Sequence, residues 1–318
     1  MPIKFQVLHK NSSIFVAGHR GLVGSSIVRR LKELGFSNLI LKDKSELNLL
    51  NQKEVSCFFS CHQIDYVIMA AAKCGGIGDN GHYPADYFYE NAMMALNVIQ
   101  NSLKTHVKKL LYLGSSCLYP KDLSGQIQER DLLSGPLETT NLSYSIAKIS
   151  GIEFCRAIYK QYSRCFISVM PTNIYGPGDN FSSSGSHVIP ALIRKVHEAQ
   201  KDGKRHIEIW GTGKPLRNFL YVDDLAAALL ITLDRYNHIE PINIGHNDNI
   251  SISDLALLVC DAMGIKMRFK YDLSKPDGTF RKSLCLNKIN QLGFKPKIKL
   301  FTGIQNTYKW ALDNNILN

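Results

Sequence analysis

The 318-residue sequence lacks long apolar runs. Its longest unbroken stretches, such as residues 67–72, are far too short to cross a bilayer. It also has no internal repeat and no low-complexity tract. The first 13 residues carry lysines but no apolar signal core, so we expect no secretory signal and a cytoplasmic location. A content of 45% hydrophobic and 20% charged residues is typical of a soluble globular chain.

The eight cysteines have no disulfide-framework spacing, which indicates free and mostly buried thiols. Cys57, Cys61 and His62 could form half of a metal site, but no second pair follows at zinc-site spacing. We therefore expect no metal.

Acidic residues are comparatively few, with 27 Asp and Glu against 38 Lys and Arg, and the formal net charge is +11. The basic residues are dispersed, and no five-residue window is purely basic. Dispersed charge is typical of a lysine-rich surface, so we expect no nucleic-acid partner. A basic balance also suits a small substrate that carries several phosphate charges.

Short apolar runs alternate with longer stretches of helical periodicity. The expected strands are residues 13–17, 38–41, 66–72, 109–113 and 166–170. The expected helices between them include residues 52–61, 84–105 and 144–162. Strands that are apolar throughout indicate a parallel sheet covered on both faces. The fold class is therefore α/β, a Rossmann-type doubly wound parallel sheet.

The regular alternation of strands and helices ends after about Pro171, which indicates a smaller C-terminal substrate lobe. We expect residues 1–180 to form the nucleotide-binding domain, with residues 215–248 returning to it. The lobe would then comprise residues 181–214 and 249–318.

A glycine-rich turn lies directly between the first strand and the first helix. Gly18, Gly21 and Gly24 are spaced three apart within the segment GHRGLVG. The first glycine permits the tight turn, the second lets a pyrophosphate approach, and the third lets the helix pack on the strand. The segment predicts a dinucleotide site made by Gly18, His19, Arg20, Gly21, Leu22, Val23 and Gly24.

The second strand ends in Lys42, Asp43 and Lys44. An acid at this point would suit NAD, because it can hold the ribose 2′-hydroxyl. Asp43 is flanked by lysines, however, and Arg20 lies in the glycine turn. Several cations fit a 2′-phosphate better than a neutral diol, so we expect NADP(H), with Arg20 and Lys44 at the phosphate.

A tyrosine and a lysine lie four residues apart on one expected helix. Tyr144 and Lys148 share a helix face, and an ammonium beside a phenol lowers the pKa of the phenol. Such a tyrosine can protonate a carbonyl oxygen as a hydride reaches the carbon. Ser115 follows the fourth strand, where it can bind the same oxygen. Serine, tyrosine and lysine in this order indicate a short-chain dehydrogenase.

The chain resembles the GDP-L-fucose synthases, which are extended short-chain dehydrogenases with epimerase and reductase activity. The likeness runs through almost the whole chain. The motifs that carry it are AGHRGLVGS (17–25), AAAKCGGI (70–77), LGSSCLYP (113–120), YSIAK (144–148), VMPTNIYGP (169–177), DNF (179–181), SHVIPAL (186–192), the segment WGTGKPLRNFLYVDDLA from residue 210, and SKPDGTFRK (274–282).

The resemblance implies Ser115, Tyr144 and Lys148 as the reduction set, Cys117 as the base for epimerisation and His187 as its partnering acid. The chemistry of the residues agrees with these roles. A ketone at C4 of a sugar acidifies the hydrogens at C3 and C5, so inversion needs a base on one face and a proton donor on the other. A thiol and an imidazole suit that work near neutral pH.

The resemblance also implies where the ligands bind. The substrate would be a GDP-linked 4-keto-6-deoxy sugar held by Lys195, Trp210, Arg217 and Asp277. The family often has arginine where Lys195 stands, so this chain loses a bidentate contact there but keeps the charge. The cofactor would also contact Leu113, Gly114 and Ser116, and the nicotinamide pocket would be lined by Pro171, Thr172, Asn173 and Ile174.

We therefore expect C3 and C5 epimerisation followed by NADPH-dependent reduction at C4. The alternatives are a colitose-type or heptose-type relative, a pure 4-reductase and a nucleotide sensor without turnover. The family resemblance further implies a homodimer, through residues 84–105 and 144–162.

Overall fold

A computed structural model describes residues 5–123, 125–182, 185–275, 277 and 283–317. The largest sheet in this part of the chain is parallel throughout. Its strands, in spatial order, are β2 (Leu39–Ile40), β1 (Ile14–Ala17), β3 (Tyr66–Met69), β4 (Lys109–Leu113), β5 (Phe166–Pro171) and β9 (Ile242–Ile244). The strand order changes direction between β1 and β3. Ligands bind at such a switch point, beyond the carboxyl ends of the strands.

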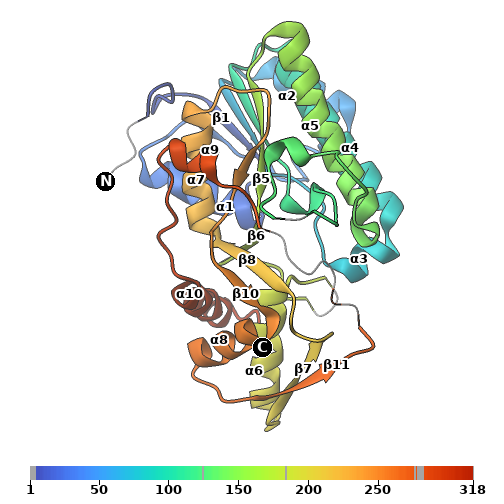
Figure 1. The fold of residues 1–318 in the computed structure, drawn as a ribbon. Helices are drawn as coiled ribbons and strands as arrows, with labels where there is room; N and C mark the ends of the chain where they lie inside the picture. The colour runs from blue at the N-terminus through green and yellow to red at the C-terminus, as the bar shows by residue number, and fades with distance from the viewer. Residues whose placement is uncertain (1–4, 124, 183–184, 276, 278–282, 318) are drawn as a thin grey trace.

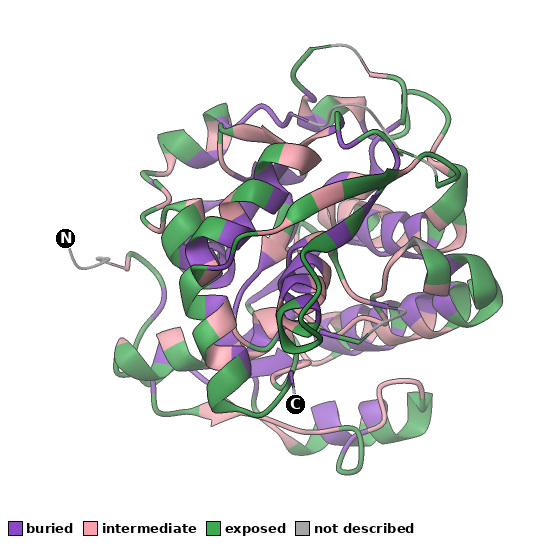
Figure 2. Ribbon diagram, turned by 90° about the horizontal axis from the view of Figure 1, so that it is seen from below, coloured by how far each residue is buried: buried purple, intermediate pink, exposed green. Residues whose placement is uncertain are grey.

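Helices cover both faces of this sheet, as Figure 1 shows. One face carries α1 (Leu22–Glu33) and α7 (Val222–Arg235), and α9 (Asn287–Gln291) packs beside β9. The other face carries α2 (Gln52–Cys61), α4 (Pro84–Lys104) and α5 (Leu142–Tyr162). Strands β1, β3, β4 and β5 are buried at every residue, because helices exclude water from both sides (Figure 2). The predicted Rossmann-type fold is confirmed.

Smaller sheets form the lower part of the molecule in Figure 1. Strands β10 (Asn249–Ser251), β8 (Leu216–Tyr221) and β6 (Asn173–Tyr175) form one, and β7 (His206–Trp210) pairs in parallel with β11 (Arg268–Asp272). The helices here are α6 (Val188–Lys201), α8 (Ile252–Met263) and α10 (Leu300–Asp313). They enclose a second hydrophobic core, separate from the core of the main sheet.

The chain crosses between these two cores in a way that bears on the predicted domain boundaries. Within residues 215–248, α7 and β9 pack with the main sheet, but β8 belongs to a smaller sheet. Leu284, Leu286, Ile289 and Phe294 pack in the main core, although the sequence placed 249–318 in the lobe. We propose that residues 284–294 belong to the nucleotide-binding domain, and that the lobe otherwise follows the sequence-based division.

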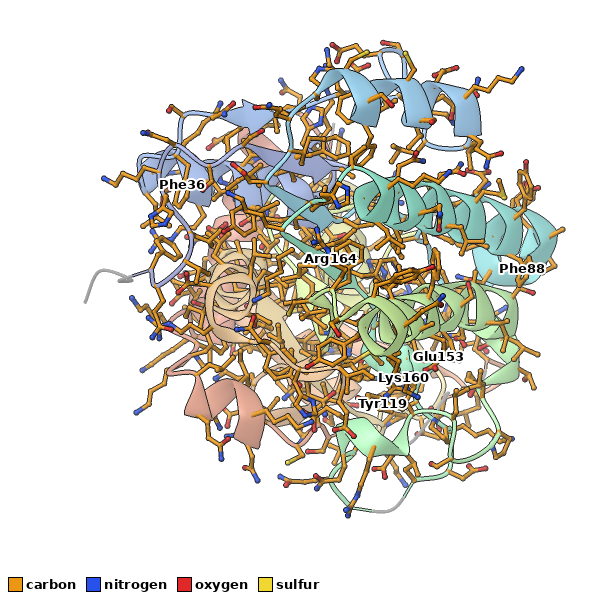
Figure 3. The ribbon with its side chains drawn as sticks, turned by 90° about the horizontal axis from the view of Figure 1, so that it is seen from above. Phe36, Phe88, Tyr119, Glu153, Lys160 and Arg164 are labelled. Carbon is orange, nitrogen blue, oxygen red and sulfur yellow. The ribbon has the colours of Figure 1, made fainter. Side chains whose placement is uncertain are left out.

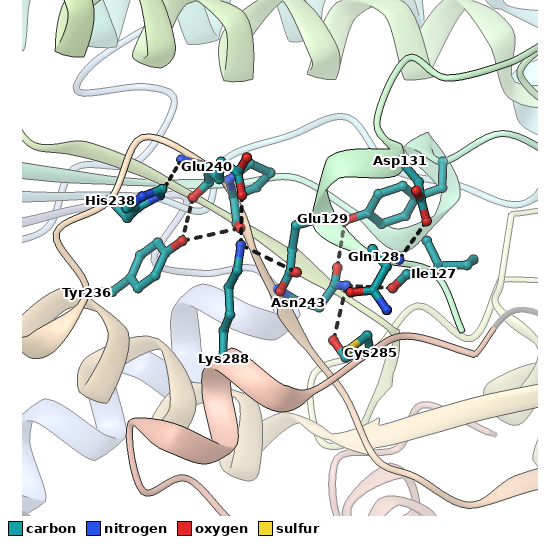
Figure 4. A network of polar contacts seen from close by, with 12 residues as sticks. Ile127, Gln128, Glu129, Asp131, Tyr236, His238, Glu240, Asn243, Cys285 and Lys288 are labelled. Atoms are coloured by element: carbon teal, nitrogen blue, oxygen red, sulfur yellow. Dashed lines mark hydrogen bonds and ion pairs between the residues drawn. The ribbon is translucent and has the colours of Figure 1, made fainter. Parts of the chain in front are cut away.

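A buried polar network holds this returning segment (Figure 4). The amide of Asn243 on β9 donates to the carbonyl oxygens of Ile127 (3.0 Å) and Cys285 (3.2 Å). Its backbone N–H donates to Glu129 (3.2 Å), and Lys288 lies 3.5 Å from the same carboxylate. Since buried polar groups need such partners, the network fixes the segment around Cys285 and Lys288 onto the main sheet.

The N-terminal segment is fixed in a similar way. The carboxylate of Asp234, buried at the end of α7, accepts hydrogen bonds from the backbone N–H groups of Gln6, Val7 and Leu8 at 2.8–3.0 Å. These donors offset the cost of burying the charge at the negative end of the α7 dipole. No helix in the described part of the chain is long and apolar enough to span a membrane.

Candidate active site

The glycine turn after β1 approaches β3 closely. Gly18 has φ +82°, and a Cβ at this position would lie 2.6 Å from the backbone nitrogen of Ala71. A Cβ on Gly24 would collide with the carbonyl oxygen of Gly18. Gly21 differs, because the nearest atom to its Cβ position is 3.5 Å away. Its missing side chain therefore leaves open space at the N-terminus of α1, where Leu22 and Val23 begin the helix.

The open end of α1 suits an anion. Gly21 caps the helix without a side-chain hydrogen bond, and the first turn contains no acidic residue. The backbone N–H groups and the positive end of the helix dipole therefore face the space above Gly21 without a competing carboxylate. A pocket of about 610 Å³ adjoins this point and is lined in part by Gly18, His19, Arg20, Gly21, Lys44 and Ala70.

Asp43, the acid that could have indicated NAD, is engaged by its neighbours. Its Oδ1 accepts hydrogen bonds from the hydroxyl (2.6 Å) and backbone N–H (2.9 Å) of Ser45, and Oδ2 pairs with Arg20 at 2.8 Å. The Ser45 hydroxyl bond is the largest of the interactions that hold the pKa of Asp43 below its usual value. Asp43 thus orders the turn and orients Arg20, whose own side chain is largely exposed at the pocket rim.

Strand β4 delivers a group of polar residues to the same edge of the sheet. After Leu113 and Gly114, the Ser115 hydroxyl accepts a hydrogen bond from the backbone N–H of Cys117 at 3.3 Å. This bond caps a short 3-10 helix, Ser116–Leu118, and leaves Cys117 half-buried beside Ser115. A Cβ on Gly114 would lie 2.7 Å from Met170 Sδ and 2.9 Å from the backbone oxygen of Val169, so the strand end packs closely on β5 there.

Helix α5 brings Tyr144 and Lys148 to this strand end. Lys148 is 2% exposed, and its Nζ lies 4.4 Å from the centroid of the Tyr112 ring, a cation–π arrangement. Gly151 makes room for that ring, since a Cβ there would lie 2.5 Å from Tyr112 Cζ. Burial lowers the pKa of Lys148 to about 8.

The phenol of Tyr144 lies 3.8 Å from the Cys74 thiol. From the sequence we expect the Lys148 ammonium to lower the pKa of this phenol. Burial instead raises the pKa of Tyr144 well above the usual 10, and the Cys74 and Cys117 thiols raise it further. The phenol therefore keeps its proton at neutral pH, as a proton donor must.

His187 enters from the other part of the molecule, as the residue that caps α6. Its loop is tied to the first part by a hydrogen bond from Gly76 N to Gly185 O at 3.2 Å. Gly76 lies two residues after Cys74, which contacts Tyr144. The structure thus links the His187 loop to the segment beside Tyr144.

The residues predicted for the nicotinamide side follow β5. Pro171 ends the strand, and the Thr172 hydroxyl and the Asn173 amide both donate to the carbonyl oxygen of Asn218 at 3.0 Å. These bonds join β5 to β8, with Ile174 in the middle of β6. The main sheet and a smaller sheet are therefore held together at this corner.

The predicted substrate residues lie in two groups on the smaller sheets. Lys195 donates to Glu208 O at 2.8 Å, and its Nζ lies 5.5 Å from the ring centroid of Trp210, which is 56% exposed. Lys275 lies at the same distance from that ring. Sequence reasoning did not single out Lys275, although its place two residues before Asp277 could have pointed to it.

Arg217 and Asp277 form the second group. Arg217 Nη2 donates to the backbone carbonyl of Asp277 at 3.2 Å, while the Asp277 carboxylate accepts from Thr212 N (2.7 Å) and Oγ1 (2.8 Å). Burial lowers the pKa of Arg217 and of Lys195. Residues 276 and 278–282 of the SKPDGTFRK motif lie outside the described residues.

The chain is similar to known proteins along most of its length. The sequence profile of the NAD dependent epimerase/dehydratase family matches residues 14–245. The chain is 50% identical over 305 residues to GDP-L-fucose synthase 1 of Arabidopsis thaliana, covering 96% of this chain and 94% of that one. It is 46% identical to GDP-L-fucose synthase of Escherichia coli strain K12, covering 95% and 97%.

A solved structure is similar over the same extent. The GDP-L-fucose synthetase of Naegleria fowleri, bound to NADP, superposes with a TM-score of 0.90 at 30% identity. The match covers 98% of this chain and 96% of that chain. The chain therefore belongs to the NAD dependent epimerase/dehydratase family and, within it, to the GDP-L-fucose synthases.

Proposed function

We propose that this protein converts GDP-4-keto-6-deoxy-D-mannose to GDP-L-fucose, by epimerisation at C3 and C5 and NADPH-dependent reduction at C4. The observation that carries the proposal is the full-length identity of 46–50% to proteins named GDP-L-fucose synthase. The positions of Ser115, Cys117 and Tyr144 around one strand end support it.

The cofactor side fits NADP(H). The pyrophosphate would lie at the N-terminus of α1, where Gly21 leaves room and no carboxylate opposes the charge. Arg20 and Lys44 would bind the 2′-phosphate at the pocket rim. The Asp43 carboxylate supports this role of Arg20, because it forms an ion pair with Arg20 and accepts a hydrogen bond from the Ser45 hydroxyl in the adjoining turn.

In the proposed epimerisation, Cys117 removes the proton from C3 or C5 and His187 returns one to the opposite face. The two groups come from different parts of the chain, the end of β4 and the N-terminus of α6, which supports access from two sides. The ketone at C4 stabilises the carbanion as an enolate. GDP would be held by Lys195, Arg217 and Asp277, with Trp210 as an aromatic wall.

In the proposed reduction, Tyr144 donates its proton to the C4 oxygen, which Ser115 also binds. NADPH supplies the hydride when it is bound. Lys148 lies one helical turn from Tyr144 and carries positive charge below about pH 8, so it would favour the phenolate that remains. The high pKa of Tyr144 keeps the donor protonated before the step.

We further propose a cytoplasmic homodimer that associates through α4 and α5. These helices pack side by side on one flank of the molecule, and Figure 3 shows Phe88 near the outer end of α4. Phe88, Leu96 and Ile146 are exposed apolar side chains on this pair of helices. Exposed apolar groups at such a face support association between copies.

One experiment tests the function. The protein is incubated with GDP-4-keto-6-deoxy-D-mannose and NADPH, and the product sugar is identified by NMR. We expect GDP-L-fucose with equimolar oxidation of NADPH. A D-configured 6-deoxy product would indicate a pure 4-reductase. Turnover only with a dideoxy or heptose substrate would indicate a colitose-type or heptose-type relative.

A further inference from the structure

A buried carboxylate lies beside His187. The Asp179 side chain is 2% exposed, and its Oδ1 lies 3.5 Å from Nδ1 of His187. Oδ1 also accepts a hydrogen bond from the backbone N–H of Asn180 at 2.8 Å. Oδ2 is buried and makes no hydrogen bond with any described residue. A buried carboxylate with so few donors is costly, so a positive partner is needed to stabilise it.

The position of His187 at a helix N-terminus also calls for a nearby negative charge. The residue caps the N-terminus of α6, and its ring makes no capping hydrogen bond. The positive end of a helix dipole disfavours an imidazolium ion. The Asp179 carboxylate offsets that effect, and its hydrogen bond is the largest of the contributions that raise the pKa of His187 above its usual value, against burial, which lowers it.

Other charged groups also lie near this loop. Asp79 on α3 (Ile77–His82) lies against Gly185, on the side of the loop that faces α3. Arg194 of α6 bonds Phe181 O at 2.6 Å and Glu198 at 2.5 Å. Among the ion pairs of the described residues, Asp179 has His187 as its basic partner.

We propose that Asp179 is the positioning residue for His187: its carboxylate holds the proton on Nδ1 and leaves the Nε2–H to serve the substrate carbon. This inference rests on the proposed epimerase function. It resembles other sites in which a carboxylate fixes the tautomer and orientation of a reacting imidazole.

The proton balance of the step is simple. The Cys117 thiolate takes the proton from C3 or C5, and the electron pair of that C–H bond enters the enolate of the C4 ketone. The enolate carbon then takes the Nε2 proton of the His187 imidazolium on the opposite face, which leaves a neutral imidazole. Asp179 stays ionised throughout. Solvent water restores the proton to His187 and accepts the one on Cys117.

The first test measures the pKa of His187 directly and needs no catalytic turnover. The protein is labelled with ¹³C at histidine Cε1, and the His187 signal is assigned by its loss in His187→Gln. We expect Asp179→Asn, which keeps the side-chain shape, to lower the pKa of His187. Asp79→Asn is the matched control, a neighbouring carboxylate at the same loop, and should leave that pKa close to the parent value. Equal pKa values in parent and Asp179→Asn would overturn the proposal.

The second test separates inversion from reduction. We expect Asp179→Asn to slow solvent deuterium uptake at C3 and C5 by about 10- to 100-fold, the scale found when carboxylates behind metal-bound histidines are removed. Oxidation of GDP-L-fucose by NADP⁺ reverses the reduction without inversion, so it should stay near the parent rate. Parental exchange in Asp179→Asn would contradict the inference.

Failure of the parent protein to exchange deuterium would instead refute the proposed function, while the pKa measurement would still report on the Asp179–His187 pair. Asp179→Ser serves as a second variant if the asparagine variant does not fold. It should give the same lowered pKa of His187, and an unchanged value there would equally reject the proposal.

Discussion

The main sheet and the smaller sheets place their functional groups in opposite environments. Lys148 is 2% exposed and packs on Tyr112, inside the same core that holds β4 and β5. Trp210 is 56% exposed, and the side chain of His187 is 49% exposed. The reduction groups are thus fixed by packing before any ligand binds, whereas the lobe groups depend on a few polar partners. Changes at Ser115, Tyr144 or Lys148 should therefore alter the reduction step, and changes at the lobe groups should alter binding or inversion.

The largest effect should follow from the main-sheet side. Tyr144→Phe removes the proposed proton donor and should lower reduction by about 10²- to 10⁴-fold, the usual scale for a lost general acid. The fold should persist, because among the described residues the phenol has a single polar contact, with the Cys74 thiol at 3.8 Å. Stopped-flow oxidation of NADPH measures the rate, and a parental rate would remove Tyr144 from the mechanism.

Cys117→Ser tests whether inversion and reduction use separate groups at the same strand end. A hydroxyl has a far higher pKa than a thiol and cannot readily take a carbon-bound proton, so deuterium uptake at C3 and C5 should collapse. Ser115, Tyr144 and Lys148 remain in place, and slow reduction of the unepimerised ketone to a D-configured 6-deoxy sugar is expected. Exchange is followed by NMR, and uptake at the parent rate in both positions would place the base elsewhere.

Burial of Lys148 should make stability depend on pH. Its pKa is lowered from 10.5 to about 8, so between these values the unfolded chain binds the proton more tightly and the free energy of unfolding rises with pH. From pH 7 to 10 the parent should gain about 2 kcal/mol relative to Lys148→Met. Urea unfolding at each pH measures this. Lys109→Met offers a parallel case, since burial lowers the pKa of Lys109 to about 8 as well. Equal slopes in parent and both variants would contradict the expectation.

A substitution in the lobe should change the binding of the GDP-sugar. Arg217→Lys keeps the charge but loses the guanidinium fork, and with it the bond from Nη2 to Asp277 O. We expect KM for the GDP-sugar to rise about tenfold, or roughly 1.4 kcal/mol, with kcat little changed. A fall in kcat at constant KM would contradict the assignment of Arg217 to substrate binding.

An effect of about the same size concerns exposed charges at the rim of the cofactor pocket. Replacing Arg20 and Lys44 together by alanine should reduce the preference for NADPH over NADH by roughly tenfold, since screened surface pairs contribute little each. Turnover with NADH should barely change. Ratios of kcat/KM for the two cofactors measure the effect, and equal use of both by the parent would reject the NADP assignment.

The main sheet could be read from the sequence because its signals are local. Buried parallel strands are continuous apolar runs, so β1, β4 and β5 were predicted to within a residue or two. The strands β6, β9 and β10 have three residues each, too few to show a period. Their pairings join segments far apart in the chain, which no local pattern reveals.

The same limit applies to the site. Tyr144 and Lys148 are four residues apart on a helix, so their proximity follows from helical geometry. The Tyr112–Lys148 contact and the Asp179–His187 pair depend on how a loop or strand packs against a distant element. The pKa of Tyr144 was expected to fall and is raised, because burial depends on the whole fold rather than on one neighbour. The ligand roles drawn from the family resemblance remain predictions for the experiments above.

The contact of Asp234 with residues 6–8 also constrains the order in which parts of the chain can fold. During synthesis residues 6–8 leave the ribosome before their hydrogen-bond acceptor, which follows 226 to 228 residues later. Closing so long a loop costs more entropy than any pairing within the sheet, so the hydrogen bonds to Asp234 form only after α7 has been made. Until then the backbone N–H groups of residues 6–8 stay with water and the carboxylate lacks its donors. In a chain that stops before α7 these N–H donors lack their acceptor, although the Tyr66 hydroxyl can still donate to the carbonyl oxygen of Val7.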